Sequence, residues 1–197
     1  MQSKNHPQKG SHIKVEPIKT IEDINRLKEY LKFQPRNLAI FNIGLYGCLR
    51  ASDILKIKTG EVRNLKTGDC LWIKEKKTSK QKCISVNKAI YDAVQDLIPT
   101  LENQENDAFL FQSEKGGGQI CVSHLNFLVK KWCRKIKLKG NYGSHTMRKT
   151  AGYMHYHILK TPLPVIMDML NHSSFKMTYI YLGIQPEDLK EAYMKEF

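Results

Sequence analysis

Apolar residues recur every three or four positions over several long segments of this chain, which is the pattern of amphipathic helices. The segment 38–49 differs from the rest because it is apolar on most faces, so we expect a helix buried at the centre of the protein. The helices predicted from these patterns include residues 21–33, 38–47, 51–57, 87–101, 123–136, 144–158 and 163–171, and two more are expected between there and residue 197. The sequence therefore predicts a mainly helical fold.

Between residues 59 and 86 the pattern changes to short apolar runs separated by turn-forming residues. Two such runs lie at 70–73 and 83–86, with turns expected near 66–69 and 77–81. Neighbouring strands joined by a short turn pair antiparallel. We therefore expect the α+β class, mainly α with a small antiparallel β-sheet.

The chain of 197 residues, 41% of them hydrophobic, has the length and apolar content of one domain. Residues 1–16 carry few apolar side chains and several lysines, which predicts a flexible basic N-terminal arm. The arm could wrap DNA or serve only as a solubilising tail. Residues 17–197 are expected to form the folded domain.

Positive charge dominates the composition. Lys and Arg total 32 against 19 Asp and Glu, which gives a net charge of +13. Such a balance favours binding to a polyanion, most often a nucleic acid, although an ordinary basic soluble protein is the alternative. Neither a signal peptide nor an apolar stretch of about 18 residues is found, so a membrane partner is not expected.

The cysteine pattern argues against cysteine-based structural sites. The five cysteines are odd in number and form no Cys-x-x-Cys pair. We therefore expect neither a disulfide framework nor a zinc site, and a reducing cytoplasm is the simplest location. Cys48 and Cys133 lie in apolar helical patterns and are expected in the core.

The polar face of the predicted helix 123–136 is a row of positive side chains without an acidic neighbour. Lys130, Lys131, Arg134 and Lys135 form this row. A basic stripe on an amphipathic helix suits a DNA backbone or major groove, and a solvated surface is the alternative. We expect these four residues to bind DNA.

Candidate catalytic residues gather between residues 142 and 183. On a helix starting near residue 144, His145 and Arg148 are i,i+3 neighbours on one face. His172 and Tyr181 follow on later elements, nine positions apart. An anion-binding guanidinium, two imidazoles and a phenol are the groups needed to hold and attack a phosphodiester without a metal. The opposite face of the helix is expected to be buried through Met147, Ala151, Met154 and Ile158.

Two upstream segments add further candidates. Arg50 lies at the expected junction between two helices, and Asp53 at i+3 could hold its guanidinium by a charge-assisted hydrogen bond. The expected hairpin tip is rich in lysine. Lys77 is the preferred candidate there, with Lys76 and Lys80 as alternatives because the hairpin register is open.

At these residues the chain resembles the tyrosine recombinases, also called the phage integrase family. The motif His145-x-x-Arg148, the Leu-Asn-His-Ser-Ser run at 170–174 and Tyr181 are similar to the C-terminal motifs of that family. The Gly-Cys-Leu-Arg-Ala-Ser-Asp-Ile-Leu run at 47–55 resembles its first arginine motif, and Lys77 with the following threonine resembles its lysine motif.

The resemblance covers the chain from about residue 21 to its C-terminal end, with all motifs in the family's order. Asn171 departs from it, because the family usually has glycine before the second histidine. Asn is the next most suitable residue for a left-handed turn, so we expect the turn to be retained. The spacing from His172 selects Tyr181 over its neighbour Tyr179.

The resemblance implies a role for each motif residue. Arg50 and Arg148 would bind the non-bridging phosphate oxygens, with Asp53 in support. Lys77 would protonate the leaving 5′ oxygen, and Tyr181 would be the nucleophile. The remaining roles fall to the histidines: His145 as the base and His172 as a hydrogen-bond partner of the phosphate.

The resemblance further implies a site-specific recombinase that integrates, excises or inverts DNA through a 3′-phosphotyrosyl intermediate, with no metal and no cofactor. The implied partners are double-stranded DNA and three further copies of the chain, in a homotetramer on two DNA sites. A monomer off DNA and accessory DNA-bending proteins are additional expectations, as is a bacterial or phage origin. No N-terminal core-binding domain is expected. The alternatives are a type IB topoisomerase and a DNA-binding regulator that keeps the fold without cutting.

Overall fold

The computed structural model of the chain describes residues 15–76, 79–113, 118–182, 184, 190 and 193–196. Most of the expected N-terminal arm and the expected lysine Lys77 lie outside these ranges. The α-helices are α1 (Ile21–Leu31), α2 (Pro35–Tyr46), α3 (Ala51–Ile54), α4 (Thr59–Val62), α5 (Lys88–Leu97), α6 (Val122–Lys135), α7 (Thr146–Tyr153), α8 (Leu163–Met169) and α9 (Phe175–Leu182). The strands are β1 (Cys70–Lys74) and β2 (Gln81–Ser85), and short turns of 3-10 and π-helix span Ile98–Thr100 and Met154–Ile158.

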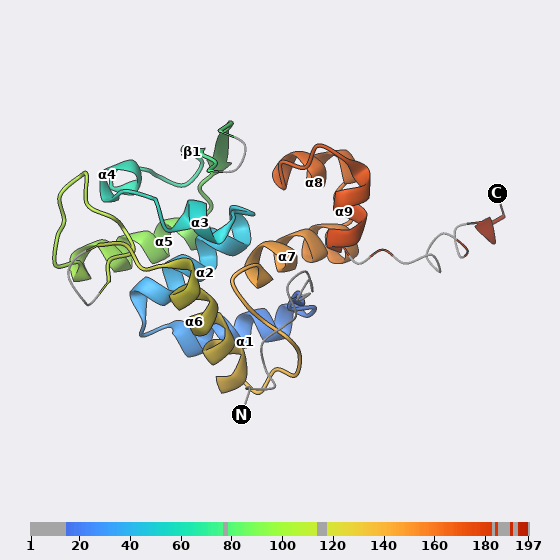
Figure 1. The fold of residues 1–197 in the computed structure, drawn as a ribbon, viewed down its shortest axis with the longest axis horizontal. Helices are drawn as coiled ribbons and strands as arrows, with labels where there is room; N and C mark the ends of the chain where they lie inside the picture. Colours follow the sequence, from blue (N-terminus) through green and yellow to red (C-terminus); the bar gives the residue numbers. More distant parts are fainter. Residues whose placement is uncertain are drawn as a thin grey trace, which may run out of the picture.

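Helix α2 is the centre of the molecule, as the sequence predicts (Figure 1). Pro35 occupies its first turn, where the missing backbone N–H costs nothing. Its middle is buried on every side and packs against α1, α5 and α7. Helices α1 and α5 bury one stripe each and leave their polar faces in water, whereas α7 is buried over most of its length. The buried apolar residues form one continuous core, so the described chain folds around a single interior.

Two glycines let helices approach closely at the positions that matter for the site. A Cβ atom on Gly44 of α2 would lie 2.8 Å from the sulfur of Met147 on α7. A Cβ atom on Gly152 of α7 would lie 3.1 Å from Leu182 on α9. The absence of these side chains brings α2, α7 and α9 together. The residues at the end of α2, along α7 and on α9 therefore share one neighbourhood.

The strands β1 and β2 pair antiparallel, with Leu71 opposite Ile84 and Trp72 opposite Cys83. Leu71, Ile73 and Ile84 are buried while Trp72 and Cys83 face outward, which is the alternation of a half-buried hairpin. The α+β fold class and the position of the small sheet are thus confirmed.

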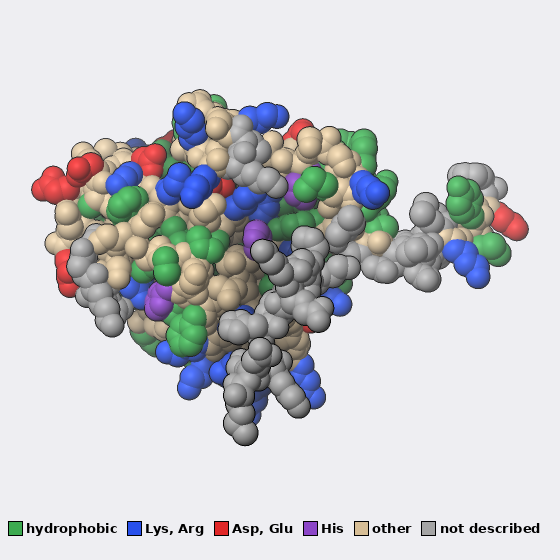
Figure 2. Space-filling model, in the orientation of Figure 1, with side chains coloured by type: hydrophobic (Ala, Val, Ile, Leu, Met, Phe, Trp, Pro, Cys, Tyr) green, Lys and Arg blue, Asp and Glu red, His purple; other side chains and the backbone are tan. Residues whose placement is uncertain are grey.

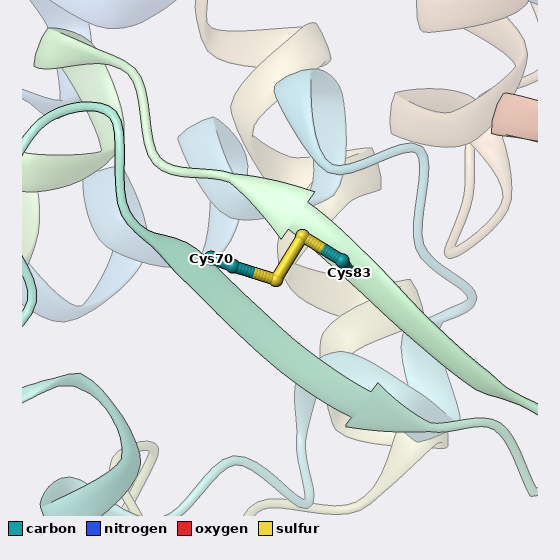
Figure 3. Close-up of a disulfide and its surroundings, with 2 residues drawn as sticks. All are labelled: Cys70 and Cys83. Carbon is teal, nitrogen blue, oxygen red and sulfur yellow. A yellow bond between two sulfur atoms is a disulfide. The ribbon is translucent and has the colours of Figure 1, made fainter.

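The expectation that no cysteines pair is wrong, because Cys70 and Cys83 form a disulfide across the hairpin (Figure 3). Their Cα atoms lie 5.5 Å apart, within the range that a disulfide spans. Spacing along the chain did not reveal this pair, since the strand register alone makes them neighbours. Cys48 and Cys133 are free and buried, as expected.

The C-terminal part of the active-site helix also departs from the expectation. Met147, Ala151 and Met154 are buried as predicted, but Ile158 is 43% exposed. The chain widens to a π-turn at Met154–Ile158, which shifts the angular position of every later side chain. The prediction for Ile158 is therefore wrong, because it assumed 3.6 residues per turn to the end of the helix.

Basic side chains are spread over much of the face seen in Figure 2, whereas acidic ones gather mainly toward its left edge. Among the helices of the described residues, none combines the length and the apolar character needed to span a lipid bilayer.

We predict that Gly44→Val lowers the free energy of unfolding by about 1–3 kcal/mol, because the new side chain overpacks the contact between α2 and α7. Urea unfolding followed by circular dichroism measures this change. Gly118→Val is the control, since a Cβ atom at this exposed glycine meets no neighbour within 4 Å. Equal stability of the two variants would contradict the close packing described above.

Candidate active site

Arg50 lies at the junction between α2 and α3. Helix α2 ends at Gly47, and Cys48 adopts the left-handed conformation with φ of 51°, which turns the chain sharply. Arg50 then takes the extended N-cap position of α3, and its side chain is 17% exposed. Asp53, buried one turn later, has its Oδ2 atom 3.9 Å from Nη1 of Arg50. The two residues are neighbours as predicted, but they form an ion pair at 3.9 Å and not the predicted hydrogen bond.

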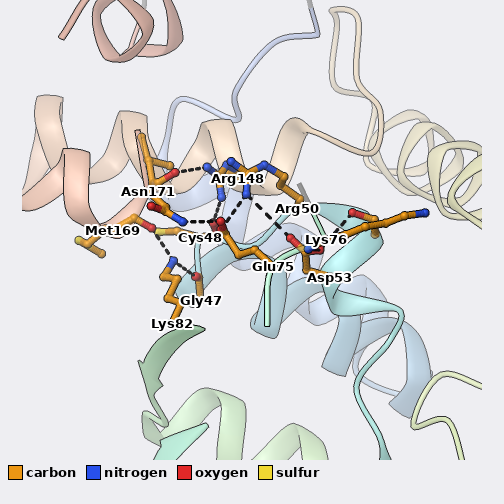
Figure 4. A network of polar contacts seen from close by, with 12 residues as sticks. Gly47, Cys48, Arg50, Asp53, Glu75, Lys76, Lys82, Arg148, Met169 and Asn171 are labelled. Atoms are coloured by element: carbon orange, nitrogen blue, oxygen red, sulfur yellow. Dashed lines mark hydrogen bonds and ion pairs between the residues drawn. The ribbon is translucent and has the colours of Figure 1, made fainter. Parts of the chain in front are cut away.

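Arg148 of α7 is 2% exposed and lies between two loops (Figure 4). Its Nη1 atom donates to the carbonyl of Cys48 at 2.5 Å, and its Nη2 atom donates to the carbonyl of Leu170. The guanidinium thereby ties the loop that carries Arg50 to the turn that carries His172.

Lys82 of β2 makes a second tie beside the first, which the sequence did not indicate. Its ammonium donates to the carbonyls of Gly47 at 3.0 Å and Met169 at 2.5 Å. Arg148 binds the carbonyls of the next residues, 48 and 170. Lys82 and Arg148 therefore join the same two loops at successive residues. Burial lowers the pKa of Lys82 below its usual range, and the positive charge of Arg148 acts in the same direction.

Glu75 is the other residue that sequence reasoning missed. It follows β1 directly, is 1% exposed, and places Oε1 2.7 Å from Nη1 of Arg50. Its Oε2 atom accepts a hydrogen bond from the side-chain amide of Asn171. Alternation along the strand would have marked position 75 as inward-facing, but the lysine-rich context marked it as solvent-exposed.

His145 occupies the N-cap position of α7. Part of its ring is exposed, yet partial burial lowers its pKa, and the positive charges of Arg148, Lys149 and Arg50 lower it further. The imidazole is therefore held toward its neutral form, which is the form that accepts a proton.

The turn between α8 and α9 presents His172. Asn171 has φ of 45°, so the predicted left-handed turn is confirmed. The Nδ1 atom of His172 lies 3.0 Å from the buried hydroxyl of Thr178, which fixes the ring plane. The ring meets that of Tyr181 edge to face, with centroids 5.1 Å apart.

Tyr181 points into the same neighbourhood from α9. Its ring centroid lies 5.9 Å from Cζ of Arg148 and 5.5 Å from Nζ of Lys149, and its hydroxyl is buried. Burial raises the pKa of the phenol, while the charge of Arg148 opposes that shift. Tyr179, the rival on the same helix, is 44% exposed. The described geometry thus favours Tyr181 as the tyrosine of the site.

The remaining predicted residues are the hairpin lysines and the basic row on α6. Lys77 is outside the described residues, but the backbone N–H of its neighbour Lys76 donates to Oδ1 of Asp53 at 3.0 Å, which anchors the hairpin on α3. The side chains of Lys76 and Lys80 are exposed. The predicted DNA-binding residues of α6 are all exposed, namely Lys130, Lys131, Arg134 and Lys135. Over the described ranges, no three His, Cys, Asp or Glu side chains gather in a way that could hold a metal ion.

Comparison with known proteins gives this cluster its context. The sequence profile of the phage integrase family matches residues 18–187, which is most of the chain. The chain belongs to the phage integrase family. The Bacillus subtilis (strain 168) protein described as probable integrase/recombinase YoeC is 32% identical over 184 residues, covering 91% of this chain and 95% of that protein. Membership of this family makes the chain a tyrosine-type site-specific recombinase.

More distant relatives share the fold over a part of their own length. Tyrosine recombinase XerC of Caldanaerobacter subterraneus subsp. tengcongensis is 28% identical over 89% of this chain, which spans 50% of that protein. The crystal structure of XerA recombinase superposes with a TM-score of 0.74 at 18% identity, over 95% of this chain and 68% of that one. XerH site-specific recombinase bound to a palindromic difH substrate superposes with a TM-score of 0.68 at 20% identity, over 91% and 53% respectively. The tyrosine recombinase catalytic-domain fold expected from the sequence is thus confirmed.

We predict that His145 titrates below pH 6.5 in the folded protein, because burial and three neighbouring cations disfavour its charged form. The ring carbon shifts of His145 in an NMR titration measure this, with His145→Gln to identify the signal. The pKa of His145 is lower in the folded state than in the unfolded state, where it is about 6.5. At pH values between these two pKa values, the unfolded state therefore binds more protons than the folded state. The contribution of His145 to stability should therefore rise with pH across that window and be lost as pH falls. A midpoint above 6.5 would contradict the electrostatics described here.

Proposed function

We propose that this chain cleaves and rejoins double-stranded DNA through a covalent 3′-phosphotyrosyl intermediate, with Tyr181 as the nucleophile. The observation that carries the proposal is the position of Tyr181, whose phenol is buried beside Arg148 and against the ring of His172 in a single chain. A phenol beside a guanidinium can attack a phosphate without a metal, because the guanidinium supplies the positive charge that stabilises the phosphate oxygens.

Arg50 and Arg148 supply the anion-binding part of the reaction. Attack on a phosphodiester builds negative charge on the non-bridging oxygens, and two guanidiniums oppose that charge at every accessible pH. Arg148 is fixed by the two carbonyls to which it donates, and Arg50 by the carboxylates of Glu75 and Asp53. Fixed donors stabilise developing charge without reorganising during the reaction.

Proton transfer completes the step. Burial keeps the Tyr181 phenol protonated at neutral pH because its pKa is raised, and the neutral imidazole of His145 is the base that accepts its proton. The phenol oxygen bonds to phosphorus as the bond from phosphorus to the 5′ oxygen breaks. Lys77, assigned by resemblance, donates a proton to that leaving oxygen, and His172 hydrogen-bonds the phosphate. The phosphotyrosyl bond conserves the energy needed for religation by a 5′ hydroxyl.

Access to the site requires a movement. The Tyr181 hydroxyl and the Nη1 atom of Arg50 are both buried in the described structure. A DNA phosphate therefore reaches them only after α9, which carries Tyr181, or the β1–β2 hairpin shifts away from α7. We propose that DNA binding drives this opening.

DNA and further copies of the chain are the proposed partners. The exposed basic row on α6 supports DNA binding, and XerH is a relative whose structure was solved on DNA. Recombination between two sites requires four cleavages, so we propose a homotetramer on two sites, formed from monomers off DNA and assisted by DNA-bending proteins.

We predict that Tyr181→Phe binds DNA with little change in affinity but forms no covalent adduct, because the variant lacks only the attacking oxygen. The substrate is a duplex nicked beside the cleavage site, with the site first located by footprinting on DNA that flanks the gene. Denaturing gels measure the adduct. The matched control is Tyr179→Phe on the same helix, which should react like the wild type. An adduct that survives in Tyr181→Phe would move the nucleophile elsewhere.

Two assays separate the proposal from its alternatives. A type IB topoisomerase relaxes supercoiled plasmid without a specific site, whereas the proposed recombinase exchanges strands only between two copies of its site. A regulator without cleavage activity binds the site but traps no wild-type adduct on the nicked duplex. Relaxation without strand exchange, or binding without an adduct, would each replace the proposed function.

We predict that Lys131→Ala and Arg134→Ala weaken binding to any DNA sequence and each reduce the slope of log affinity against log salt concentration by about 1, because each removes one phosphate contact. Fluorescence anisotropy with a labelled duplex at several salt concentrations measures the slope. Lys88→Ala is the control, since this exposed lysine on α5 is already paired with Asp92 at 2.8 Å. Unchanged slopes for the α6 variants would place the DNA on another face.

A further inference from the structure

Glu75 is a buried carboxylate inside the most cationic part of the molecule. Its side chain is fully enclosed, and Oε1 lies 2.7 Å from Nη1 of Arg50. The backbone of Glu75 is fixed as well, because its N–H donates to the carbonyl of Lys80 at 3.0 Å and its carbonyl accepts from Ser79. A buried ionised group persists only when it is paired and hydrogen-bonded, so this carboxylate depends on its partners as much as they depend on it.

Asn171 supplies the second partner. Its side-chain amide donates to Oε2 of Glu75, so one carboxylate contacts both the first arginine and the turn before His172 (Figure 4). The φ of 45° at Asn171 would suit glycine at least as well. Glycine at position 171 would therefore keep the left-handed turn but lose the side-chain amide. The contact with Glu75 requires the side chain of Asn171, whereas the turn does not.

Asp53 alone does not hold the guanidinium of Arg50. Its Oδ2 atom is 3.9 Å away, and its Oδ1 atom accepts from the backbone N–H of Lys76 and the hydroxyl of Ser52. Without Glu75 the closest carboxylate contact of Arg50 would be lost. The charges of Arg148 and Lys82 would then repel Arg50 toward the solvent, where 17% of its side chain is already exposed.

We propose that Glu75 is a positioning residue for the recombination reaction, and that Asn171 holds it in place. The Arg50–Glu75–Asn171 bridge fixes the first arginine relative to the His172 turn before DNA arrives. The inference rests on the proposed function of the site. It adds that two residues that are not among the predicted catalytic residues set the geometry of the anion-binding arginine.

The opposite role for Glu75 would be an internal anion that blocks the phosphate position. The contacts favour positioning, because Glu75 and Asp53 both approach the same nitrogen of Arg50, the buried Nη1 atom, while 17% of the side chain remains exposed. The two roles predict opposite effects when Glu75 is replaced. Loss of a positioning carboxylate slows cleavage on bound DNA, whereas loss of a blocking one speeds cleavage or tightens binding.

The test uses Glu75→Gln, Asn171→Gly and the double variant in the full chain, with Glu105→Gln as a control at an exposed acid. The first readout, without DNA, is the Nε–Hε signal of Arg50 in ¹⁵N-arginine-labelled protein, assigned with Arg50→Lys. We expect this signal to shift in both single variants and to stay in place in the control. Urea unfolding shows that each variant is folded before it is compared.

The second readout is the rate of adduct formation at saturating nicked DNA, measured beside the dissociation constant for the same DNA. Both single variants should slow the rate by about 10- to 100-fold with little change in the dissociation constant, because misplacement of a group that acts in the transition state costs rate rather than binding. The double variant should be no slower than the slower single variant, since the two residues act through one bridge.

The outcomes that overturn the proposal are specific. A faster rate or tighter binding in Glu75→Gln would make Glu75 a blocking anion, and multiplied effects in the double variant would make the two residues independent. If the wild type itself forms no adduct, the proposed function fails. The Arg50 signal then still decides whether the bridge exists, and an unshifted signal in Glu75→Gln refutes it.

Discussion

Two cations, the buried Arg148 and the half-buried Lys82, bind backbone carbonyls and hold together the loops on which the rest of the site depends. Lys82 and Arg148 donate to four carbonyls, at residues 47 and 48 on one loop and at 169 and 170 on the other. Buried carbonyls need donors, and a charged donor satisfies them more strongly than a neutral one. The loop of Arg50 and the turn of His172 are thereby fixed against each other, although no secondary structure joins them.

The same arrangement concentrates positive charge where water is scarce. Burial, and then the positive charges of Arg148 and Arg50, lower the pKa of both Lys82 and His145, and the carboxylates of Asp53 and Glu75 offset part of the positive charge of Arg50. In the proposed reaction, a phosphate that reaches Arg50 and Arg148 meets groups that are already oriented, which is the condition under which electrostatic stabilisation of a transition state is largest. The unfavourable electrostatic energy of bringing these positive charges together is overcome when the chain folds and not during the reaction.

Much of the fold follows from local patterns. The central helix α2 and the hairpin were predictable because each depends on residues a few positions apart. The exposure of Ile158 was not predictable, because a π-turn changes the helical periodicity that the prediction assumed. The disulfide of Cys70 and Cys83 was hidden for a similar reason, because it depends on the register of two strands and not on cysteine spacing.

The sequence by itself determined the helical class and the basic character, because both follow from local periodicity and composition, and its resemblance to the tyrosine recombinases proposed the motif residues. The tertiary structure alone decided that Tyr181 rather than Tyr179 is buried beside Arg148, and that Glu75 and Lys82 belong to the cluster. A lysine-rich hairpin reads as solvent-exposed when only its neighbours in sequence are known. The burial of Glu75 depends on contacts with Arg50 and Asn171, which are distant in sequence and become its neighbours only when the chain folds.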